Sequence, residues 1–298
     1  MGHDKLRKFA ENETFSCLVQ PSAAEVLADG YEHLRDHPIK GHWFGGSYCP
    51  QNRLASLDPT NAGLKSGSLV PPLTEPRVAM GFEGNTPTKP LILELGCGKG
   101  EYALELARRN PDRNYVGVDI KGARLWRGAK TATGEALPNV MFLRTRIEFI
   151  TAFFAPDEVS EIWLTFSDPQ PQSENKRLTS PLFLERYRQF LKPGGIVRLK
   201  TDSRFLHEYT RAVAGANGLR LLACTTDLYS GTPEGTIEPE VREVKTFYES
   251  MFLEQGVPIT YMAFTIDHDG PYVHPGRKFD PALWRELDDS RRSFGHQG

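Results

Sequence analysis

The sequence predicts an α/β fold in which helices cover both faces of a mostly parallel sheet. From residue 91 onwards, short apolar runs alternate with helical stretches, and this alternation is typical of parallel sheets. The first run ends in a glycine-rich turn that opens a helix, and the second run ends in an acidic residue. Both features are typical of a ligand-binding βαβ unit.

The elements follow one another in a regular order. Strands are expected at 91–95, 115–119, 140–143, 162–166 and 196–200, with helices near 101–109, 124–133, 147–153 and 182–191. Lys192-Pro193-Gly194-Gly195 predicts a turn before the fifth strand. Beyond residue 214 the pattern loosens, with strands at 221–226 and 259–264. Between them, apolar residues at helical spacing predict a helix over 244–252, which Gly256 ends.

The domain organisation follows from a change in composition. Residues 1–44 are expected to form a partly structured N-terminal extension near the mouth of the site. Residues 45–88 are rich in Pro, Gly and Ser and predict a disordered linker or insertion, because they cannot bury enough apolar surface. The α/β domain then spans 89–266. Residues 267–298 predict a polar tail with at most a short helix at 281–287.

Composition excludes several classes of protein. The 298 residues carry 36 Lys+Arg and 38 Asp+Glu, a net charge of -2. No apolar run is long enough for a membrane span, and the first residues lack a secretory signal. The four Cys are scattered without a C-x-x-C pair, which favours a reduced, cytoplasmic protein without a metal site. The oligomeric state is left as monomer or homodimer.

The low net charge conceals two basic blocks. Residues 121–146 contain six basic and one acidic side chain, and residues 176–220 contain ten and three. The segments 147–175 and 221–298 are acidic. If the fold brings the basic blocks to one face, that face can bind a polyanion. Solvated basic helix faces remain the alternative at this stage.

The glycine loop predicts a nucleotide-like cofactor. Gly96-Cys97-Gly98-Lys99-Gly100 follows the first strand in a G-x-G-x-G spacing, whereas a dinucleotide fingerprint needs G-x-G-x-x-G. Glu94 and Glu101 would repel a diphosphate but favour a cationic ligand, which points to S-adenosylmethionine. Asp119, at the end of the second strand, can accept hydrogen bonds from ribose hydroxyls.

The loop after the fourth strand, Phe166-Ser167-Asp168-Pro169-Gln170-Pro171, is a second candidate site. It lies outside the carboxyl end of a strand, where open α/β sheets bind ligands. Asp168 is its one acidic residue. A purely structural Asx turn at Asp168 remains the alternative.

Five motifs occur in an order that resembles the bacterial tRNA (guanine-N(7)-)-methyltransferases, especially the form found in Bacteroidetes. They are E-L-G-C-G-K-G at 94–100, F-S-D-P-Q-P at 166–171, K-R-L-T at 176–179, K-T-D at 200–202 and T-F-Y-E at 246–249. The resemblance covers about 1–44 and 91–266. It implies a Rossmann-like class I methyltransferase with a seven-stranded, mostly parallel sheet. It also implies S-adenosylmethionine as cofactor and tRNA as partner.

The resemblance also implies residue roles. The catalytic residue would be Asp168, which also touches the cofactor. The remaining cofactor contacts would come from Glu94, Gly96, Gly98, Asp119, Ile120 and Arg146. Substrate would be bound by Gln172, Lys176, Asp202, Thr246, Phe247, Tyr248 and Glu249.

Three residues depart from the family pattern. Arg146 stands where an Asp or Asn often contacts adenine, and Ser167 replaces a proline in the loop of the fourth strand. Gln172 replaces a common Lys, and Lys176 is expected to supply the missing charge. Phosphates are expected to bind to the basic blocks, including Lys121, Arg124, Lys130, Lys176 and Arg177.

The implied reaction is transfer of a methyl group to N7 of a guanine in the tRNA variable loop, where Asp168 would fix the base. Phe247 is expected to pack into the core, while Tyr248 is left open between packing and stacking on a base. Two other functions stay open. One is another RNA methyltransferase, such as an adenine-N(6) enzyme, and the other is a non-catalytic protein that binds S-adenosylmethionine or RNA.

Overall fold

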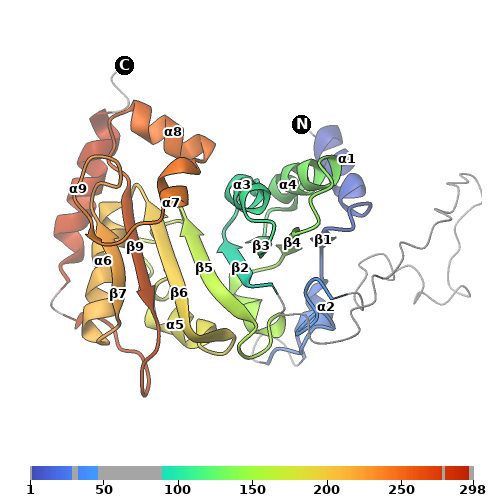
Figure 1. The fold of residues 1–298 in the computed structure, drawn as a ribbon, viewed down its shortest axis with the longest axis horizontal. Helices are drawn as coiled ribbons and strands as arrows, with labels where there is room; N and C mark the ends of the chain where they lie inside the picture. The colour runs from blue at the N-terminus through green and yellow to red at the C-terminus, as the bar shows by residue number, and fades with distance from the viewer. Residues whose placement is uncertain (1, 29–32, 46–88, 277–278, 295–298) are drawn as a thin grey trace, which may run out of the picture.

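One sheet organises the chain. The computed structural model describes residues 2–28, 33–45, 89–276 and 279–294, and within these residues nine strands pair in the order β1-β4-β3-β2-β5-β6-β9-β7-β8 (Figure 1). Residues 46–88 of the predicted linker lie outside the described residues, as does Cys49.

The five central strands run parallel. They are β4 (Val140–Arg144), β3 (Asn114–Asp119), β2 (Leu91–Leu95), β5 (Val159–Thr165) and β6 (Leu191–Thr201). β9 (Thr260–Thr265) pairs antiparallel with β6, and β7 (Leu221–Thr225) pairs antiparallel with β9. Two-residue strands extend the edges: β1 (Leu18–Val19) beside β4 and β8 (Glu234–Gly235) beside β7. The predicted seven-stranded, mostly parallel sheet is confirmed, with two short additions.

Two apolar cores flank the sheet, one on each face. One core packs under α1 (Gly2–Asn12), α3 (Glu101–Arg109), α4 (Gly122–Gly134), α7 (Pro239–Glu243) and α8 (Phe247–Glu254). The other packs under α2 (Ala23–Val26), the 3-10 helix η3 (Ile147–Ala152), α5 (Pro181–Tyr187), α6 (Arg204–Ala216) and α9 (Pro281–Phe294). The predicted three-layer arrangement is therefore confirmed.

The burial of β2 explains why four of its five residues are apolar, Glu94 being the exception. Leu91, Leu93 and Leu95 belong to one core, while Ile92 belongs to the other. Successive side chains of a strand point to opposite faces, and helices cover both faces here. The run 91–95 is therefore buried along its whole length.

Three predicted elements differ from the structure. Residues 192–195 do not precede the fifth strand but bulge within β6, since pairing with β5 jumps from Leu191 to Ile196. The helix expected over 244–252 begins only at Phe247, since residues 244–246 lie between the end of α7 at Glu243 and the start of α8. The tail forms α9, 14 residues long, where at most a short helix was expected.

The described part of the N-terminal extension packs onto the domain. β1 continues the sheet next to β4, and Trp43 donates a hydrogen bond from Nε1 to the carbonyl of Phe153 at 2.8 Å and stacks on Phe154. Trp126 of α4 donates to Glu11 of α1 at 2.7 Å. These residues are therefore more ordered than the composition of 1–44 predicts. The boundaries at residues 44 and 89 stay a prediction.

Gly100 provides a test of the fold. It begins α3 with a φ of +72°, and a Cβ placed on it would lie 2.4 Å from Cε1 of the buried Phe142. We expect Gly100→Ala to lower the free energy of unfolding by about 2 kcal/mol or more, because strain and overpacking add. Urea denaturation followed by tryptophan fluorescence measures this change.

Gly134→Ala is the matched control, because Gly134 ends α4 and nothing lies within 4 Å of its added Cβ. We expect it to change stability by less than about 1 kcal/mol. Equal effects of the two substitutions would contradict the close contact with Phe142.

Candidate active site

The candidate site lies along one edge of the sheet. The carboxyl ends of β2, β3, β4, β5 and β6 meet there because the strands are parallel. β9 starts at the same edge, since Thr260 pairs with Thr201 at the end of β6. Helix α8, which precedes β9, therefore reaches this edge too (Figure 1). All the motifs that the sequence singles out are brought to one place.

The glycine loop leaves open space at the end of β2. Gly96 and Gly98 adopt left-handed backbone angles, with φ of +80° and +58°, and a Cβ built on either meets nothing within 4 Å. The amide groups of Gly96 and Cys97 donate to the carbonyl of Val118 on β3, at 2.8 and 3.0 Å. Hydrogen bonds thus fix the side of the loop that faces the sheet, while no atoms crowd Gly96 and Gly98 on the opposite side.

Asp119 connects this loop to the next one. Its side chain is 8% exposed, and it accepts hydrogen bonds from the amides of Gly98 at 3.0 Å and Lys121 at 2.7 Å. A carboxylate can accept about four hydrogen bonds, so Asp119 keeps capacity for ribose hydroxyls. Ile120, the following residue, is 53% exposed.

Glu94 lies buried at the end of β2 and joins three elements. It accepts hydrogen bonds from the Thr165 hydroxyl of β5 at 2.6 Å and from the Ala103 amide of α3 at 3.0 Å. Burial raises the pKa of Glu94 to about 7, although the bonds from Thr165 and Ala103 act in the opposite direction. A nearby cation would favour the charged form.

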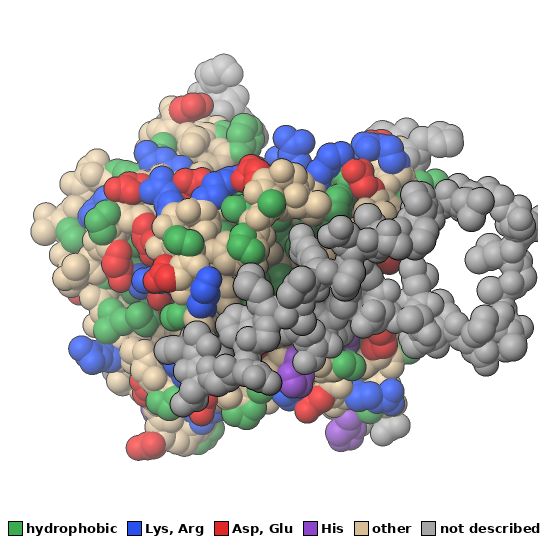
Figure 2. Space-filling model, turned by 45° about the vertical axis from the view of Figure 1, so that its right-hand side comes forward, with side chains coloured by type: hydrophobic (Ala, Val, Ile, Leu, Met, Phe, Trp, Pro, Cys, Tyr) green, Lys and Arg blue, Asp and Glu red, His purple; other side chains and the backbone are tan. Residues whose placement is uncertain are grey.

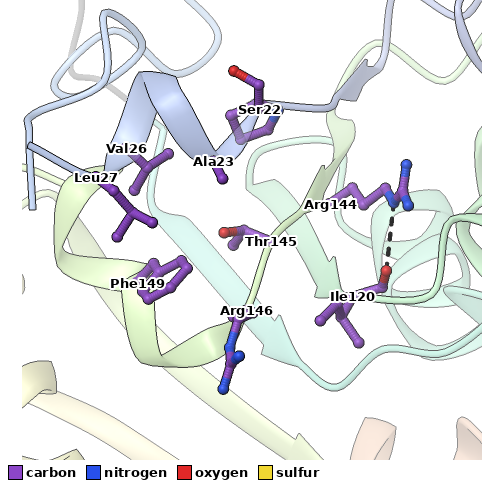
Figure 3. Close-up of a pocket in the computed structure, with 10 residues that line it drawn as sticks. Ser22, Ala23, Val26, Leu27, Ile120, Arg144, Thr145, Arg146 and Phe149 are labelled. Atoms are coloured by element: carbon purple, nitrogen blue, oxygen red, sulfur yellow. Dashed lines mark hydrogen bonds between the residues drawn. The ribbon is translucent and has the colours of Figure 1, made fainter. Parts of the chain in front are cut away.

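A cavity of about 350 Å³ opens beside Ile120 (Figure 3). α2 and the turn before it form one wall, and the ends of β3 and β4 and the start of η3 form the other. Its lining residues are Pro21, Ser22, Ala23, Val26, Leu27, Ile120, Arg144, Thr145, Arg146 and Phe149. The sequence predicted Ile120 and Arg146 in the cofactor site, and the structure brings both to this cavity. The wall at 21–27 was not predicted residue by residue.

Arg146 does not project freely into the cavity. Its guanidinium pairs with Glu148 at 3.3 Å and lies 5.6 Å from the ring of Phe149. The position where the family resemblance implies an Asp or Asn therefore presents a cation close to an aromatic ring here. Its contact with the cofactor stays a prediction.

The residues at this edge fit S-adenosylmethionine. Ile120, Val26 and Phe149 offer apolar walls for a base. The uncrowded side of Gly96 and Gly98 leaves room for a ligand against the backbone, and Asp119 offers acceptors for a ribose. Ser167 on the neighbouring loop has a buried hydroxyl without a hydrogen-bond partner among the described residues.

Asp168 is exposed on the loop after β5. Its carboxylate accepts a hydrogen bond from the amide of Gln170 at 2.9 Å, which is the Asx turn that the sequence left open. This contact uses one oxygen, so Asp168 can still face a ligand. The catalytic role of Asp168 stays a prediction.

Arg177 holds this loop, and its burial does not fit the phosphate contact expected for it. The residue is 4% exposed, and its guanidinium carbon lies 4.7 Å from the ring of Phe205 and 4.3 Å from the ring of Tyr209, both on α6. It donates hydrogen bonds to the carbonyls of Gln170 and Pro171 at 3.2 and 3.3 Å. Desolvation lowers the pKa of Arg177. A phosphate contact is excluded in this arrangement because α6 covers the guanidinium.

Gln172 and Lys176 are exposed at the same edge, Lys176 at the end of the 3-10 helix η4 (Glu174–Lys176). Both remain accessible for the predicted substrate contacts. Asp202, which follows β6 directly, is half-buried. The hydroxyl of Thr201 accepts a hydrogen bond from the amide of Ser203 at 3.0 Å and so fixes the turn around Asp202.

The T-F-Y-E box forms the first turn of α8. Thr246 caps the helix by accepting a hydrogen bond from the amide of Glu249 at 3.2 Å. Phe247 is 62% and Tyr248 47% exposed, and their rings lie 5.9 Å apart. The expectation that Phe247 packs into the core is wrong. The buried face of α8 carries Glu249 and Phe252 instead, and Phe247 lies on the opposite side.

Glu249 is buried, in contrast to the direct substrate contact that the resemblance implies. It is 0% exposed and pairs with Lys200 at 2.8 Å, and Tyr229 donates a hydrogen bond to it at 2.5 Å. Lys200 also donates to the carbonyls of Val241 and Val244, at 2.7 and 2.9 Å. Desolvation lowers the pKa of Lys200, whereas the carboxylate of Glu249 beside it acts in the opposite direction. A substrate role for Glu249 stays a prediction, while its contacts show that it anchors α8.

Sequence reasoning missed the anchors Lys200 and Tyr229. A lysine within the apolar strand 196–200 was the available signal, because buried strands carry a charge only when it is paired. Its partner lies 49 residues further on, which spacing alone does not reveal.

The described residues contain neither a candidate metal site nor a candidate membrane span. No group of three or more His, Cys, Asp or Glu side chains within them is arranged to hold a metal ion. None of the helices there is both long and apolar enough to cross a bilayer.

Sequence comparisons show a wide set of relatives. A family model described as "Putative methyltransferase" (Methyltransf_4) matches residues 88–261. A protein of Christiangramia forsetii named tRNA (guanine-N(7)-)-methyltransferase is 42% identical over 267 residues, which cover 88% of this chain and 98% of that protein. A protein of the same name from Bacteroides thetaiotaomicron is 47% identical over 212 residues, which cover 71% and 82% of the two chains. The solved structure of the 16S rRNA methyltransferase KamB is 19% identical with a TM-score of 0.46, over 60% of this chain and 88% of that one.

The fold and the family match together define a class I methyltransferase with a Rossmann-like sheet. Within this class, the chain belongs to the tRNA (guanine-N(7)-)-methyltransferase family, as the two sequence relatives show. The family resemblance drawn from the five motifs is thereby confirmed.

Glu94 makes the stability depend on pH. Its pKa of about 7 in the folded chain lies above the ordinary value of 4.5, so the native state binds the extra proton between these two values. The contribution of Glu94 to the free energy of unfolding is fully present below pH about 4.5 and is lost as the pH rises through about 7. Glu94→Gln mimics the protonated form. We therefore expect the free energy of unfolding of this variant to rise relative to that of the wild type as the pH increases from about 4.5 to about 7. Urea denaturation between pH 4.5 and 8 measures the difference, and parallel curves would contradict the raised pKa.

Proposed function

We propose that this protein transfers the methyl group of S-adenosylmethionine to N7 of a guanine in the variable loop of tRNA. The observation that carries the proposal is the convergence of the glycine loop, Asp119, the Asp168 loop and the exposed aromatic pair at one edge of the sheet, in a chain of this family. We place the reaction in the cytoplasm, where tRNA is modified.

Guanine N7 carries a lone pair in the plane of the ring and no proton, so its methylation needs no general base. The cofactor supplies an activated methyl group on a sulfonium centre. Transfer of that methyl group to N7 would leave the electron pair of the carbon–sulfur bond on sulfur and would make the guanine cationic. The protein must therefore position the two reactants and stabilise the positive charge on the base.

The residues at the edge divide this task. Asp168, exposed and held by its turn, can accept hydrogen bonds from the guanine and stabilise the cation. Asp202 can act from the end of β6. Phe247 and Tyr248 offer exposed rings on which a base can stack. Lys99, 5.6 Å from the ring of Phe247, brings a positive charge close to this aromatic pair.

Substitution of Asp168 tests the proposal. We expect Asp168→Ala to lower methyl transfer by at least about 100-fold, since it removes charge stabilisation made in the transition state. Cofactor affinity should stay within about threefold, because the glycine loop and Asp119 are intact. Transfer of radiolabelled methyl groups to bulk tRNA gives the rate, and calorimetry gives the affinity.

The modified base decides between the candidate functions. Nuclease digestion of the labelled tRNA should yield 7-methylguanosine. Label at adenine would favour an adenine-N(6) enzyme instead. Cofactor binding without methyl transfer by the wild type would favour a non-catalytic protein, and full turnover by Asp168→Ala would exclude the role given to Asp168.

Lys121, Arg124 and Arg127 form a basic stripe that begins at the cofactor site. Lys121 follows Asp119 and Ile120, and the three are exposed and three residues apart at the start of α4. Residues three apart are neighbours on a helix. None of the three has an ion-pair partner within the described part of the chain. Figure 2 shows Lys and Arg side chains recurring along the upper rim of the molecule, with acidic side chains between them.

Lys130 behaves differently. It pairs with Glu11 at 2.8 Å and lies 5.0 Å from the Trp126 ring, where Arg7 and Lys8 of α1 gather as well. These cations attach α1 to α4 and are partly neutralised. The basic stripe, rather than Lys130, is therefore the part of the first basic block that we assign to tRNA phosphates.

The double variant Arg124→Gln/Arg127→Gln tests this assignment. We expect tRNA affinity to fall by about tenfold and the slope of log K against log salt to fall by about 1.5 to 2, because two phosphate contacts are lost. Fluorescence anisotropy with tRNA at several salt concentrations measures both quantities.

Lys192→Gln/Arg220→Gln is the matched control. Both side chains are exposed at the amino ends of β6 and β7, the opposite edge of the sheet. This variant removes the same charge and should leave the salt slope unchanged. If both double variants weaken binding equally, net charge and not the basic stripe determines affinity.

A further inference from the structure

Helix α9 brings a carboxylate to the N-terminus of α6. The helix lies against α6 (Figure 1) and beyond the region 88–261 that matches the family. Asp288 of α9 is 8% exposed. It accepts hydrogen bonds from the amides of Arg204 at 2.8 Å and Phe205 at 3.3 Å, and from the hydroxyl of Ser203.

These contacts complete the cap of α6. The first amides of a helix lack partners within the helix, and its N-terminus attracts negative charge. Asp288 takes two of these amides, and the Ser203 hydroxyl accepts a third from Leu206 at 3.1 Å. Charged acceptors give stronger hydrogen bonds than neutral ones. The start of α6 is therefore fixed largely from α9.

The capped turn is the one that presents Asp202. Its two neighbours in sequence are both held in place. Ser203 is bound by Asp288, and the carbonyl of Thr201 accepts a hydrogen bond from Thr260 of β9 at 2.9 Å. Asp202 lies between them, at the carboxyl edge of the sheet. Any shift of the α6 N-terminus would therefore move Asp202.

α6 also supports the loop of Asp168. Phe205 and Tyr209 stack on Arg177, which holds the carbonyls of Gln170 and Pro171. Phe279, just before α9, lies 5.5 Å from both of these rings. The segment at 279–294 thus packs against α6, the helix that contacts both the Asp168 loop, through Arg177, and the turn of Asp202.

We propose that Asp288 is a positioning residue for methyl transfer, acting through Ser203 and the first turn of α6 on Asp202. The inference rests on the proposed function, since it assigns Asp288 to the same site. It makes the C-terminal helix, which the sequence suggested to be a tail, part of the machinery of the reaction.

A double-mutant cycle tests the proposal. Asp288→Asn and Asp202→Asn are made singly and together, and single-turnover methyl transfer is measured per cofactor-binding site. We expect Asp288→Asn alone to lower the rate about tenfold, but less than about threefold in the Asp202→Asn background, because residues that act together are not additive. Cofactor affinity should stay within about twofold.

Glu286→Gln is the matched control, because Glu286 is exposed on the same helix, two residues away. It removes the same charge and should leave the rate unchanged. Asp288→Glu keeps the charge and should recover part of the rate, even if Asp288→Asn lowers the melting temperature. Equal losses from Asp288→Asn in both backgrounds, no loss at all, or an equal loss from Glu286→Gln would each overturn the proposal.

Hydrogen exchange separates this proposal from the proposed function. Asp288→Asn should speed exchange at the amides of Arg204 and Phe205 by about tenfold or more, since they lose a charged acceptor. A wild-type protein that binds the cofactor but methylates no tRNA would refute the proposed function. The exchange rates would then still test whether Asp288 fixes the start of α6. Unchanged protection of the two amides would overturn its positioning role.

Discussion

The parallel pairing of β4, β3, β2, β5 and β6 brings the ends of five strands to one edge, and every part of the candidate site depends on it. Loops that are far apart in sequence become neighbours without a long connection. The antiparallel strand β9 adds one more group. Since it runs in the opposite direction, it begins where β6 ends, and α8 is delivered to the same edge.

Buried polar groups then fix the ends of these elements. Glu94 joins β2 to β5 and α3, and Lys200 joins β6 to α8 and to the end of α7. Lys200 has an acceptor for each of its three protons, which compensates the loss of water. Removing one partner of such a pair leaves an unpaired buried charge and costs about 3–5 kcal/mol. These contacts set positions that apolar packing alone would leave variable.

Much of this fold could be predicted from local patterns. The strands, the glycine loop and the acid after β3 carry their signals within a few residues, because burial and turn geometry act locally. Arg177 and α9 could not be predicted in this way. Arg177 lies in a basic run, and only contact with Phe205 and Tyr209, about 30 residues later, makes it buried. The sequence of α9 is mostly polar, and Asp288, which caps α6 from this helix, accepts a hydrogen bond from Ser203, 85 positions earlier in the chain.

Phe247 shows how a distant contact reverses a local pattern. Glu249, Phe252 and Leu253 lie within about 100° of one another around α8, and they form its buried side. Phe247 precedes Glu249 by two residues, about 200° of rotation, and so points away from the core. Burying Phe247 instead would turn Glu249 outwards and leave the charge of Lys200 unpaired in the interior. That penalty exceeds the gain of about 1.5–3 kcal/mol from burying one aromatic ring. The exposed aromatic pair at the carboxyl edge of the sheet is therefore a consequence of the ion pair beneath it.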